Sequence, residues 1–359
     1  DARKTKSYLE AVALEEKWMA MELAYKRHFA NSHVTELEDT ARHGDYFERR
    51  KAIRLLQWVH TEDTARFLLD LLLSETDQGI REQSAVSLGR IILPATTSEP
   101  YVVKDQFRDF VHNEVLQAYF AESDPLIRRQ LYHFVAYLIA ADLEDLYLEN
   151  LRSRDFDLFK CSLDALSRLH SERALEPFFQ VLNDLIRDYY FPTREWLGDK
   201  TANQRSTIRY IVLAFRDIGE AAVPFLLSHL DDPNPEVRRQ VAMALGLLDR
   251  SEAVPELMVA LQKSTNIGDK LLAIQLLKVL QAREAIPVLI QGLRDPYQDN
   301  RGFYRIRHAA FRALNKLGVE CVNMGDGEYV LAEPVHTSGQ PPVTNQPGGR
   351  NPCTSDRWS

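Results

Sequence analysis

The ten histidines and three cysteines are the residues best suited by type to bind a metal ion or act as a nucleophile. His28 and His33 are five residues apart, whereas two imidazoles share one helical face at a spacing of four. Four others lie in separate helical segments and are interpreted as surface or boundary residues: His133, His170, His229 and His308. The chain also lacks the P-loop, G-x-G-x-x-G and G-x-S-x-G patterns. We therefore predict no catalytic residue, no metal site and no cofactor.

The cysteines do not form a framework, because three of them cannot all pair. Cys161 lies in the apolar helical stretch LFKCSLDAL, where we expect it to pack as a small hydrophobic residue. Cys321 and Cys353 flank a hairpin-like segment and a polar tail. A disulfide between these two is one alternative, and two free thiols are the other.

Two clusters of aromatic and arginine residues are the strongest candidates for binding. They lie in the segments IRDYYFPTREWLGDK and RDPYQDNRGFYRIR. Aromatic and arginine side chains dominate binding hot spots, because they bury a large area for little loss of rotamer entropy. The alternative is that the rings pack these loops back onto neighbouring helices. The basic and aromatic mix over 301–312 could also bind nucleic acid locally. The candidate binding residues are Tyr189, Tyr190, Arg194, Trp196, Arg301, Phe303, Tyr304 and Arg305.

A repeated helical pattern positions both clusters. The segment from Pro235 to Leu261 reads as helix, turn and helix, with Val237, Val241 and Leu245 on one apolar stripe. A basic residue near the start of each first helix recurs along the chain, 32 or 33 residues apart at four of seven steps: Arg49, Arg81, Arg128, Lys160, Arg205, Arg238, Lys270 and Arg307. One such pair cannot bury its own apolar faces, so stacked pairs are expected to form a solenoid. The alternative is a helical bundle without repeats.

These features resemble a known repeat family. The Asp232-Pro233 turn, the basic residue one turn into the first helix and the Ala-x-Pro start of the second helix are similar to HEAT repeats, particularly the HEAT-like repeats first named from phycobilin lyases. The Ala-x-Pro start recurs at Ala222–Pro224, Ala253–Pro255 and Ala285–Pro287. The resemblance covers about three quarters of the chain and implies an all-α fold, a right-handed α-solenoid of HEAT-like helical hairpins.

The ends of the chain lie outside this pattern. The segment ECVNMGDGEYVLAEP predicts a small β-hairpin that covers the last repeat. Near the other end, Trp18, Met21, Tyr25 and Phe29 form a stripe on one helix, which we expect to cap the first repeat; a partner-binding helix is the alternative. The predicted organisation is an N-terminal helix or cap over 1–43, a solenoid of about eight units over 44–318, a hairpin cap over 319–335 and a flexible tail over 336–359.

Charge and motifs weigh against several functions. Acidic residues exceed basic ones by 52 to 44, which disfavours a broad nucleic-acid-binding surface. Deoxyhypusine hydroxylases, which resemble this repeat class, use His-Glu dipeptides, and this chain contains none. HEAT-like DNA glycosylases need a cationic concave face, whereas the second helices expected to supply that face carry mostly acidic residues: Glu62, Asp63, Asp70, Glu176, Asp184, Asp231 and Glu256.

We therefore predict a non-catalytic scaffold or adaptor that binds another protein, alone or within a larger complex, through the solenoid edge and the concave groove. The alternative is a phycobilin-lyase-like or other enzymatic or chaperone member of the class. No run of 18 apolar residues occurs, so no membrane span is expected. The chain begins at Asp1 rather than Met, which leaves an exported, processed protein and a trimmed chain both open.

Overall fold

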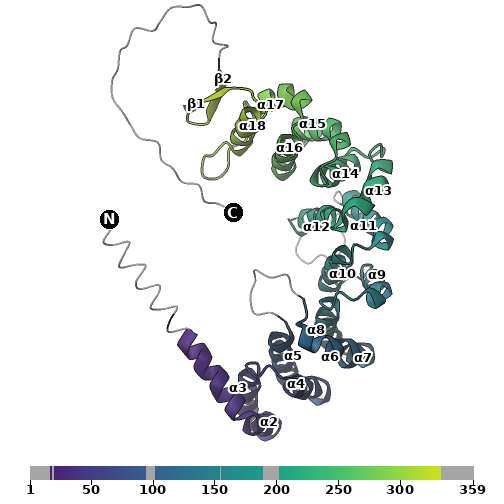
Figure 1. The fold of residues 1–359 in the computed structure, drawn as a ribbon, viewed down its shortest axis with the longest axis vertical. Coiled ribbons are helices and arrows are strands. Elements are labelled where there is room, and N and C mark those ends of the chain that lie inside the picture. Colours follow the sequence, from purple (N-terminus) through teal and green to yellow (C-terminus); the bar gives the residue numbers. More distant parts are fainter. Residues whose placement is uncertain (1–16, 18–19, 94–101, 154, 189–201, 333–359) are drawn as a thin grey trace, which may run out of the picture.

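The computed structural model describes residues 17, 20–93, 102–153, 155–188 and 202–332. Its helices form an open, C-shaped arc, with helical residues 20–32 near one end and a small β-hairpin at the other (Figure 1). Helix pairs stack along this arc and each contacts its neighbours, which is the architecture of an α-solenoid. The predicted all-α solenoid is therefore confirmed. Of the helices described, none has both the length and the apolar content to cross a membrane.

Each structural unit except the last contains a first and a second helix; the last described helix, α18, is followed by the β-hairpin. The first helices are α3 (Tyr46–Leu56), α5 (Gln78–Ile92), α8 (Pro125–Ala136), α10 (Phe156–Arg168), α12 (Ala202–Ile218), α14 (Pro235–Leu247), α16 (Ile267–Val279) and α18 (Arg305–Lys316). The second helices are α4 (Glu62–Ser74), α9 (Glu144–Asn150), α11 (Leu175–Asp188), α13 (Ala222–Ser228), α15 (Val254–Lys263) and α17 (Ile286–Gly292). The second helix after α5 is a composite of α6 (Arg108–Phe110), a π-helical turn (Val111–Val115) and α7 (Leu116–Ala121). Helix α2 (Val34–His43) precedes the first of these units.

Short polar side chains start most of the first helices. Asp or Asn stands at the N-cap and accepts backbone N–H groups of the first turn, which otherwise lack partners. These N-caps are Asp45, Asp77, Asp124, Asp155, Asn234 and Asn266. Because each cap directly follows a turn, it sets where the next unit begins.

The recurring basic residue near the start of each first helix has a structural role; it stands four positions after the cap in α3 and α5 and three positions after the cap in α18. In three units its Nε donates to a backbone carbonyl in or just after the preceding helix: Arg49 to Ala41 at 2.8 Å, Arg81 to Leu72 at 2.8 Å and Arg307 to Asp295 at 2.7 Å. Such carbonyls have no intrahelical partner, so the guanidinium ties one unit to the next. Lys160 breaks the pattern: buried Phe159 is four residues after the Asp155 cap, while Lys160 is exposed over the Tyr210 ring.

One contiguous apolar core runs between the helices from Ala30 to Leu317. Leu245 is fully buried within it, as the stripe on α14 predicts. Cys161 is buried as well, and burial raises the pKa of its thiol to about 12, so it packs as the expected small hydrophobic residue.

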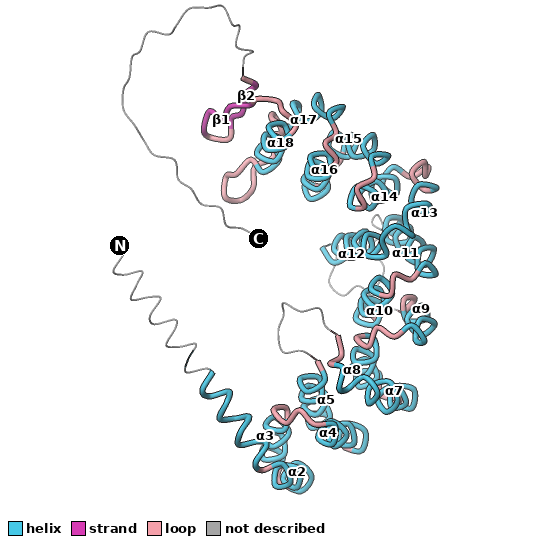
Figure 2. The backbone as a smooth tube through the Cα atoms, viewed as in Figure 1, coloured by secondary structure: helices cyan, strands magenta, loops and turns pink. Residues whose placement is uncertain are grey.

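The C-terminal hairpin consists of β1 (Cys321–Gly325) and β2 (Glu328–Leu331), which pair antiparallel and lie beside α18 (Figure 2). Tyr329 of β2 packs on Phe311 of α18, with their ring centroids 4.8 Å apart. The turn runs through Gly325, Asp326 and Gly327, all with positive φ, as that sequence indicates. The predicted hairpin over the last repeat is confirmed.

The expected stripe on the N-terminal helix does not pack as predicted. Met21 and Tyr25 are 57% and 69% exposed, whereas Ala30, at the end of the helix next to the solenoid, is fully buried. Trp18 lies outside the described residues. Met21 and Tyr25 therefore do not pack against the first repeat, although their spacing places them on one face of the helix. The part of the helix that carries them projects away from the arc (Figure 1).

Candidate binding groove

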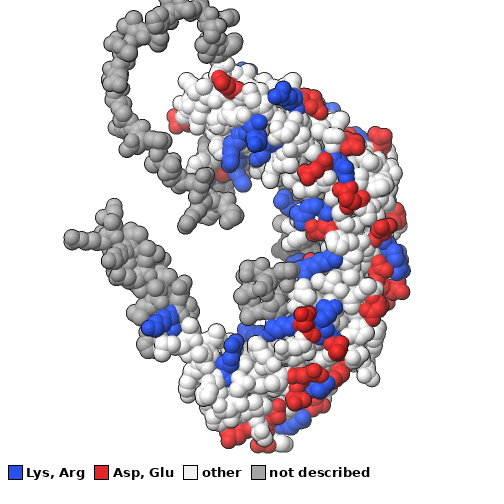
Figure 3. Space-filling view, viewed as in Figure 1, with Lys and Arg blue, Asp and Glu red and all other residues white. Residues whose placement is uncertain are grey.

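The inner, concave side of the arc is lined by the first helices, and the second helices form the outer side (Figure 1). This reverses the sequence-based expectation, which placed the acidic second helices in the groove. The first helices carry 21 Lys and Arg residues against 7 Asp and Glu, and the second helices carry 4 against 12. Figure 3 shows Lys and Arg side chains along the inner margin and many Asp and Glu along the outer one. The concave face is therefore lined by helices rich in basic residues, contrary to the prediction, although the chain as a whole is acidic.

In the N-terminal half of the arc, several first-helix arginines are engaged by carboxylates. Arg49 pairs with Glu75, and Arg81 donates to Glu122 at 2.7 Å, with both pairs largely shielded from solvent. The hydrogen bond from Arg49 holds the pKa of the Glu75 carboxyl below its usual value, with help from the backbone N–H groups of residues 76 and 77. These arginines stabilise the stacked units.

Three arginines in the C-terminal half differ. Arg209 on α12, together with Arg305 and Arg312 on α18, is exposed. Within the described part of the chain, none of the three side chains forms a hydrogen bond or ion pair. Helix α18 contains no acidic residue at all. These guanidinium groups are available to a partner.

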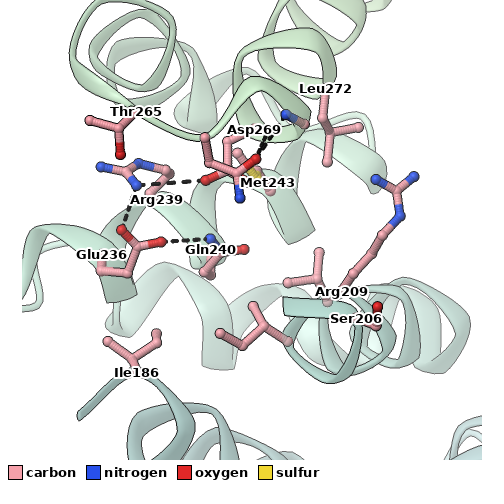
Figure 4. A pocket seen from close by; sticks show the side chains of 14 residues that line it. Ile186, Ser206, Arg209, Glu236, Arg239, Gln240, Met243, Thr265, Asp269 and Leu272 are labelled. Atoms are coloured by element: carbon pink, nitrogen blue, oxygen red, sulfur yellow. Dashed lines mark hydrogen bonds and ion pairs between the residues drawn. The ribbon is translucent and has the colours of Figure 1, made fainter. Parts of the chain in front are cut away.

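A cavity of about 320 Å³ opens between α12, α14 and α16 on the concave side (Figure 4). Its apolar lining is made by Ile186, Ile208, Val212, Met243 and Leu272. On its polar side, Arg239 bonds to Glu236 and lies 3.6 Å from Asp269, so that its charge is compensated within the chain. Arg209 stands at the opposite side of the cavity without a dashed line to any neighbour (Figure 4). The cavity thus has an apolar lining and, at one side, the Arg209 guanidinium, which has no hydrogen bond or ion pair with the described residues.

A second concavity lies in the loop 293–304 between α17 and α18. Asp299 organises this loop, because its carboxylate accepts the backbone N–H groups of Arg301 and Phe303, each at 3.0 Å. These hydrogen bonds, that of Phe303 foremost, lower the pKa of the Asp299 carboxyl. Phe303 is 64% exposed, and Arg301 and Arg305 are exposed beside it. The structure therefore brings three of the predicted binding residues together at one open surface.

Tyr304 is used differently from its neighbours. The Arg307 guanidinium lies 3.9 Å from the centroid of its ring, and the ring also lies so close to Gly327 that a Cβ there would be 2.1 Å from it. Tyr304 therefore packs the hairpin turn against the start of α18, as the alternative interpretation expected for such rings. Gly327 is required here both by this close approach and by its positive φ.

The sequence of the C-terminal half matches a known family. The family model for HEAT repeats matches residues 199–267 and 223–302. The chain is a HEAT-like repeat protein. No curated protein sequence matches it.

Solved structures similar to this HEAT-like repeat protein are distant in sequence. YibA of Escherichia coli is 17% identical over 79% of this chain and 92% of its own, with a TM-score of 0.44. Kap95p, solved with RanGDP, is 11% identical over 80% of this chain and 40% of its own, with a TM-score of 0.51. The CpcE–CpcF phycocyanin lyase complex of Nostoc sp. PCC7120 is 16% identical over 79% and 92%, with a TM-score of 0.29. Of these three, Kap95p has a TM-score above 0.5, and at 11% identity that likeness shows the fold alone.

The other predicted site residues fall outside the part of this HEAT-like repeat protein that the structure describes. Tyr189, Tyr190, Arg194 and Trp196 belong to the segment 189–201, and Cys353 belongs to the segment after residue 332. The first aromatic cluster and the Cys321–Cys353 disulfide therefore stay predictions. Among the described residues, no three His, Cys, Asp or Glu side chains are grouped so that they could hold a metal ion.

Sequence reasoning did not name Arg209 or Arg312 as protein-binding residues, and both lie inside helices rather than in the longer loops. Arg312 ends the basic and aromatic stretch 301–312, where it was considered only for local nucleic-acid binding. A further signal for Arg312 is that α18 carries four basic residues and no acid. Arg209 had no such signal, because its lack of a partner depends on which side chains surround it.

Proposed function

We propose that this HEAT-like repeat protein is a non-catalytic scaffold or adaptor that binds another protein through its concave groove and its C-terminal edge. The observation that carries the proposal is that Arg209, which has no hydrogen bond or ion pair with the described residues, is exposed beside an apolar cavity on the concave side, with Arg305 and Arg312 exposed on α18. Arginine and apolar surface together are typical of the centres of protein interfaces. The predicted division into cap, solenoid, hairpin and tail is part of this proposal, with the solenoid as the binding unit.

The fold supports such a role. A stack of helical pairs presents a long concave surface whose side chains do not take part in the core, so they can vary without unfolding the repeats. Kap95p, which has a similar fold over 80% of this chain, binds RanGDP, so an arc of this kind can bind a folded protein. An individual fold does not identify a partner, and the proposal rests on the groove itself.

The edge forms the second part of the proposed surface. The connection from α11 to α12 and the connection from α17 to α18 both run from a second helix to the next first helix. In a solenoid all such connections emerge along the same edge. The predicted cluster around Trp196 would then share an edge with Phe303, about 30 Å away at roughly 10 Å per helix layer. One partner could contact both.

The alternative is a phycobilin-lyase-like, chaperone or other enzymatic role. An enzyme of this class needs polar groups that converge on a substrate. In the cavity between α12, α14 and α16, however, both Glu236 and Asp269 face Arg239, which compensates them. The exposed Arg209 and the apolar lining of this cavity are better suited to binding a partner than to catalysis.

Site-specific photo-crosslinking tests the proposal. A benzoylphenylalanine at Gln275, on the exposed face of α16, is compared in the producing cells with one at Gln180, on the exposed face of α11. We expect discrete protein adducts from position 275 and none from position 180, with mass spectrometry identifying the partner. Adducts of equal yield at both positions, or at position 180 alone, would contradict a binding role for the groove.

A further inference from the structure

The groove between α12 and α18 has cations at its two ends and an apolar middle. Arg209 marks the α12 end, and Arg305 and Arg312 mark the α18 end. Arg305 and Arg312 are seven residues apart, so they lie on the same face of α18. Between these ends, Leu272 is half-buried in the cavity wall and Val279 is 50% exposed. Figure 3 shows a group of Lys and Arg side chains on the inner margin at the α18 end.

The cations of the two middle helices are mostly compensated within the chain. Three of the four basic residues in α14 and α16 are bonded to carboxylates: Arg238 to Glu256, Arg239 to Glu236 and Lys270 to Asp295. A ligand in the groove therefore meets exposed arginines at its two ends that have no hydrogen bond or ion pair with the described residues, and apolar side chains between them. At the α18 end the Asp299 carboxylate interacts electrostatically with Arg305.

This pattern favours a protein segment over a nucleic acid. A single-stranded nucleic acid carries one negative charge per nucleotide and prefers a continuous cationic track with aromatic stacking platforms. An acidic peptide can instead concentrate its carboxylates at two points, where each forms charge-assisted hydrogen bonds with a guanidinium. It can also place one apolar side chain in the cavity between α12, α14 and α16.

The spacing of the helices limits the length of such a segment. From α12 to α18 there are three steps between neighbouring first helices, about 8–10 Å each. The two cationic ends are then about 25–30 Å apart, which an extended chain covers in about eight residues at roughly 3.3 Å per residue.

We propose that the concave face between α12 and α18 binds an extended acidic segment of a partner protein, with carboxylates on Arg209 at one end and on Arg305 and Arg312 at the other, and one apolar residue in the cavity between them. The inference rests on the proposed protein-binding function and specifies the chemistry of the partner.

Fluorescence anisotropy with a labelled peptide of sequence EEGSGLGSGEE tests this at low salt. Its glutamate pairs match the spacing of the two cationic ends, and its leucine falls between them. We expect binding that weakens at least about fivefold in Arg209→Gln and at least about tenfold in the Arg305→Gln/Arg312→Gln variant, because each change removes a charge-assisted contact. The matched control is Arg187→Gln on the exposed side of α11, which should bind like the wild type. Melting curves of all variants verify that they are folded.

Two further probes separate the apolar and the electrostatic contributions. A peptide with every glutamate replaced by glutamine should lose binding, and Leu272→Ser should weaken it at least about threefold by removing apolar contact in the cavity. Binding of the acidic peptide that is insensitive to all the groove variants would overturn the proposal.

Single-stranded oligouridine serves as the competing probe. If it binds with the same dependence on Arg209 and Arg312 while the acidic peptide does not bind, the groove recognises nucleic acid and the proposal is wrong. If position 275 crosslinks to a protein in cells but that protein binds equally well to the arginine variants, protein binding stands and the acidic-segment inference fails. The two proposals can therefore fail separately.

Discussion

The inner and outer helical layers of this protein bury similar apolar residues against each other but present opposite charges to solvent. The first helices contain three times as many basic as acidic residues, and the second helices show the reverse ratio. Solvated charges on a helix face contribute little to stability, so each layer can change its outward charge without changing the fold. The comparison teaches that the buried stripe shared by both layers maintains the solenoid, while the outward face of one layer is free for binding.

The largest expected effect comes from placing a charge in the shared stripe. Leu245→Asp on α14 buries a carboxylate without a partner, and we expect it to lower the free energy of unfolding by about 4 kcal/mol or more. Urea denaturation followed by circular dichroism measures this. The control is Val279→Asp, on the exposed face of α16, which should change stability by no more than about 0.5 kcal/mol. Equal losses of unfolding free energy in both variants would mean that the exposed face of α16 contributes as much to stability as the buried stripe of α14.

Next in size is the loss of an arginine that connects units. Arg81 donates to the Leu72 carbonyl and to Glu122, whose side chain is only 9% exposed. Arg81→Met leaves this carboxylate shielded without its cation, so we expect a loss of about 2–4 kcal/mol in the same denaturation assay. Arg66→Met is the control, because Arg66 pairs with exposed carboxylates on the outer layer and should cost about 1 kcal/mol or less. A larger loss of unfolding free energy in Arg66→Met than in Arg81→Met would contradict this prediction.

A smaller, pH-dependent effect is expected at Glu75. Its pKa is lower in the folded chain than in the unfolded chain because Arg49 donates a hydrogen bond to the ionised form. Its contribution is therefore fully present above the unfolded pKa, near 4.5, and is lost as the pH falls through the folded pKa. We expect Glu75→Gln to cost about 1–2 kcal/mol at pH 7 and progressively less towards pH 3. Unfolding curves of both proteins across this pH range check it, and a difference that does not vary with pH would contradict the assignment.

The smallest effect on stability is expected from the groove arginines. The combined substitution of Arg209, Arg305 and Arg312 by Gln removes three exposed cations that have no hydrogen bond or ion pair within the described chain. We expect the free energy of unfolding to change by no more than about 0.5 kcal/mol. Thermal and urea denaturation of the triple variant test this. A loss above about 2 kcal/mol would show that these arginines stabilise the fold, and the contrast with Arg81 would disappear.

Local patterns in the sequence predicted much of the fold correctly. The helical repeat and its apolar stripe predicted the solenoid, and Gly325, Asp326 and Gly327 mark the hairpin turn, because these features depend on residues close together in the chain. Caps such as Asp77 and Asn266 were identified only in the structure. Phe303 is exposed and its binding role stays a prediction, whereas the Tyr304 ring packs on Gly327.

The sequence by itself determined the period, the buried stripe of α14 and the hairpin, since these follow from spacing along a few turns of chain. Only the tertiary structure decided which helical layer faces inward, because curvature results from small rotations that accumulate between stacked pairs. It also decided that Tyr304 packs on Gly327, while Arg209 has no intramolecular hydrogen bond or ion pair with the described residues. These outcomes depend on side chains brought together from distant parts of the sequence, and they separate the arginines that stabilise this protein from those that can bind its partner.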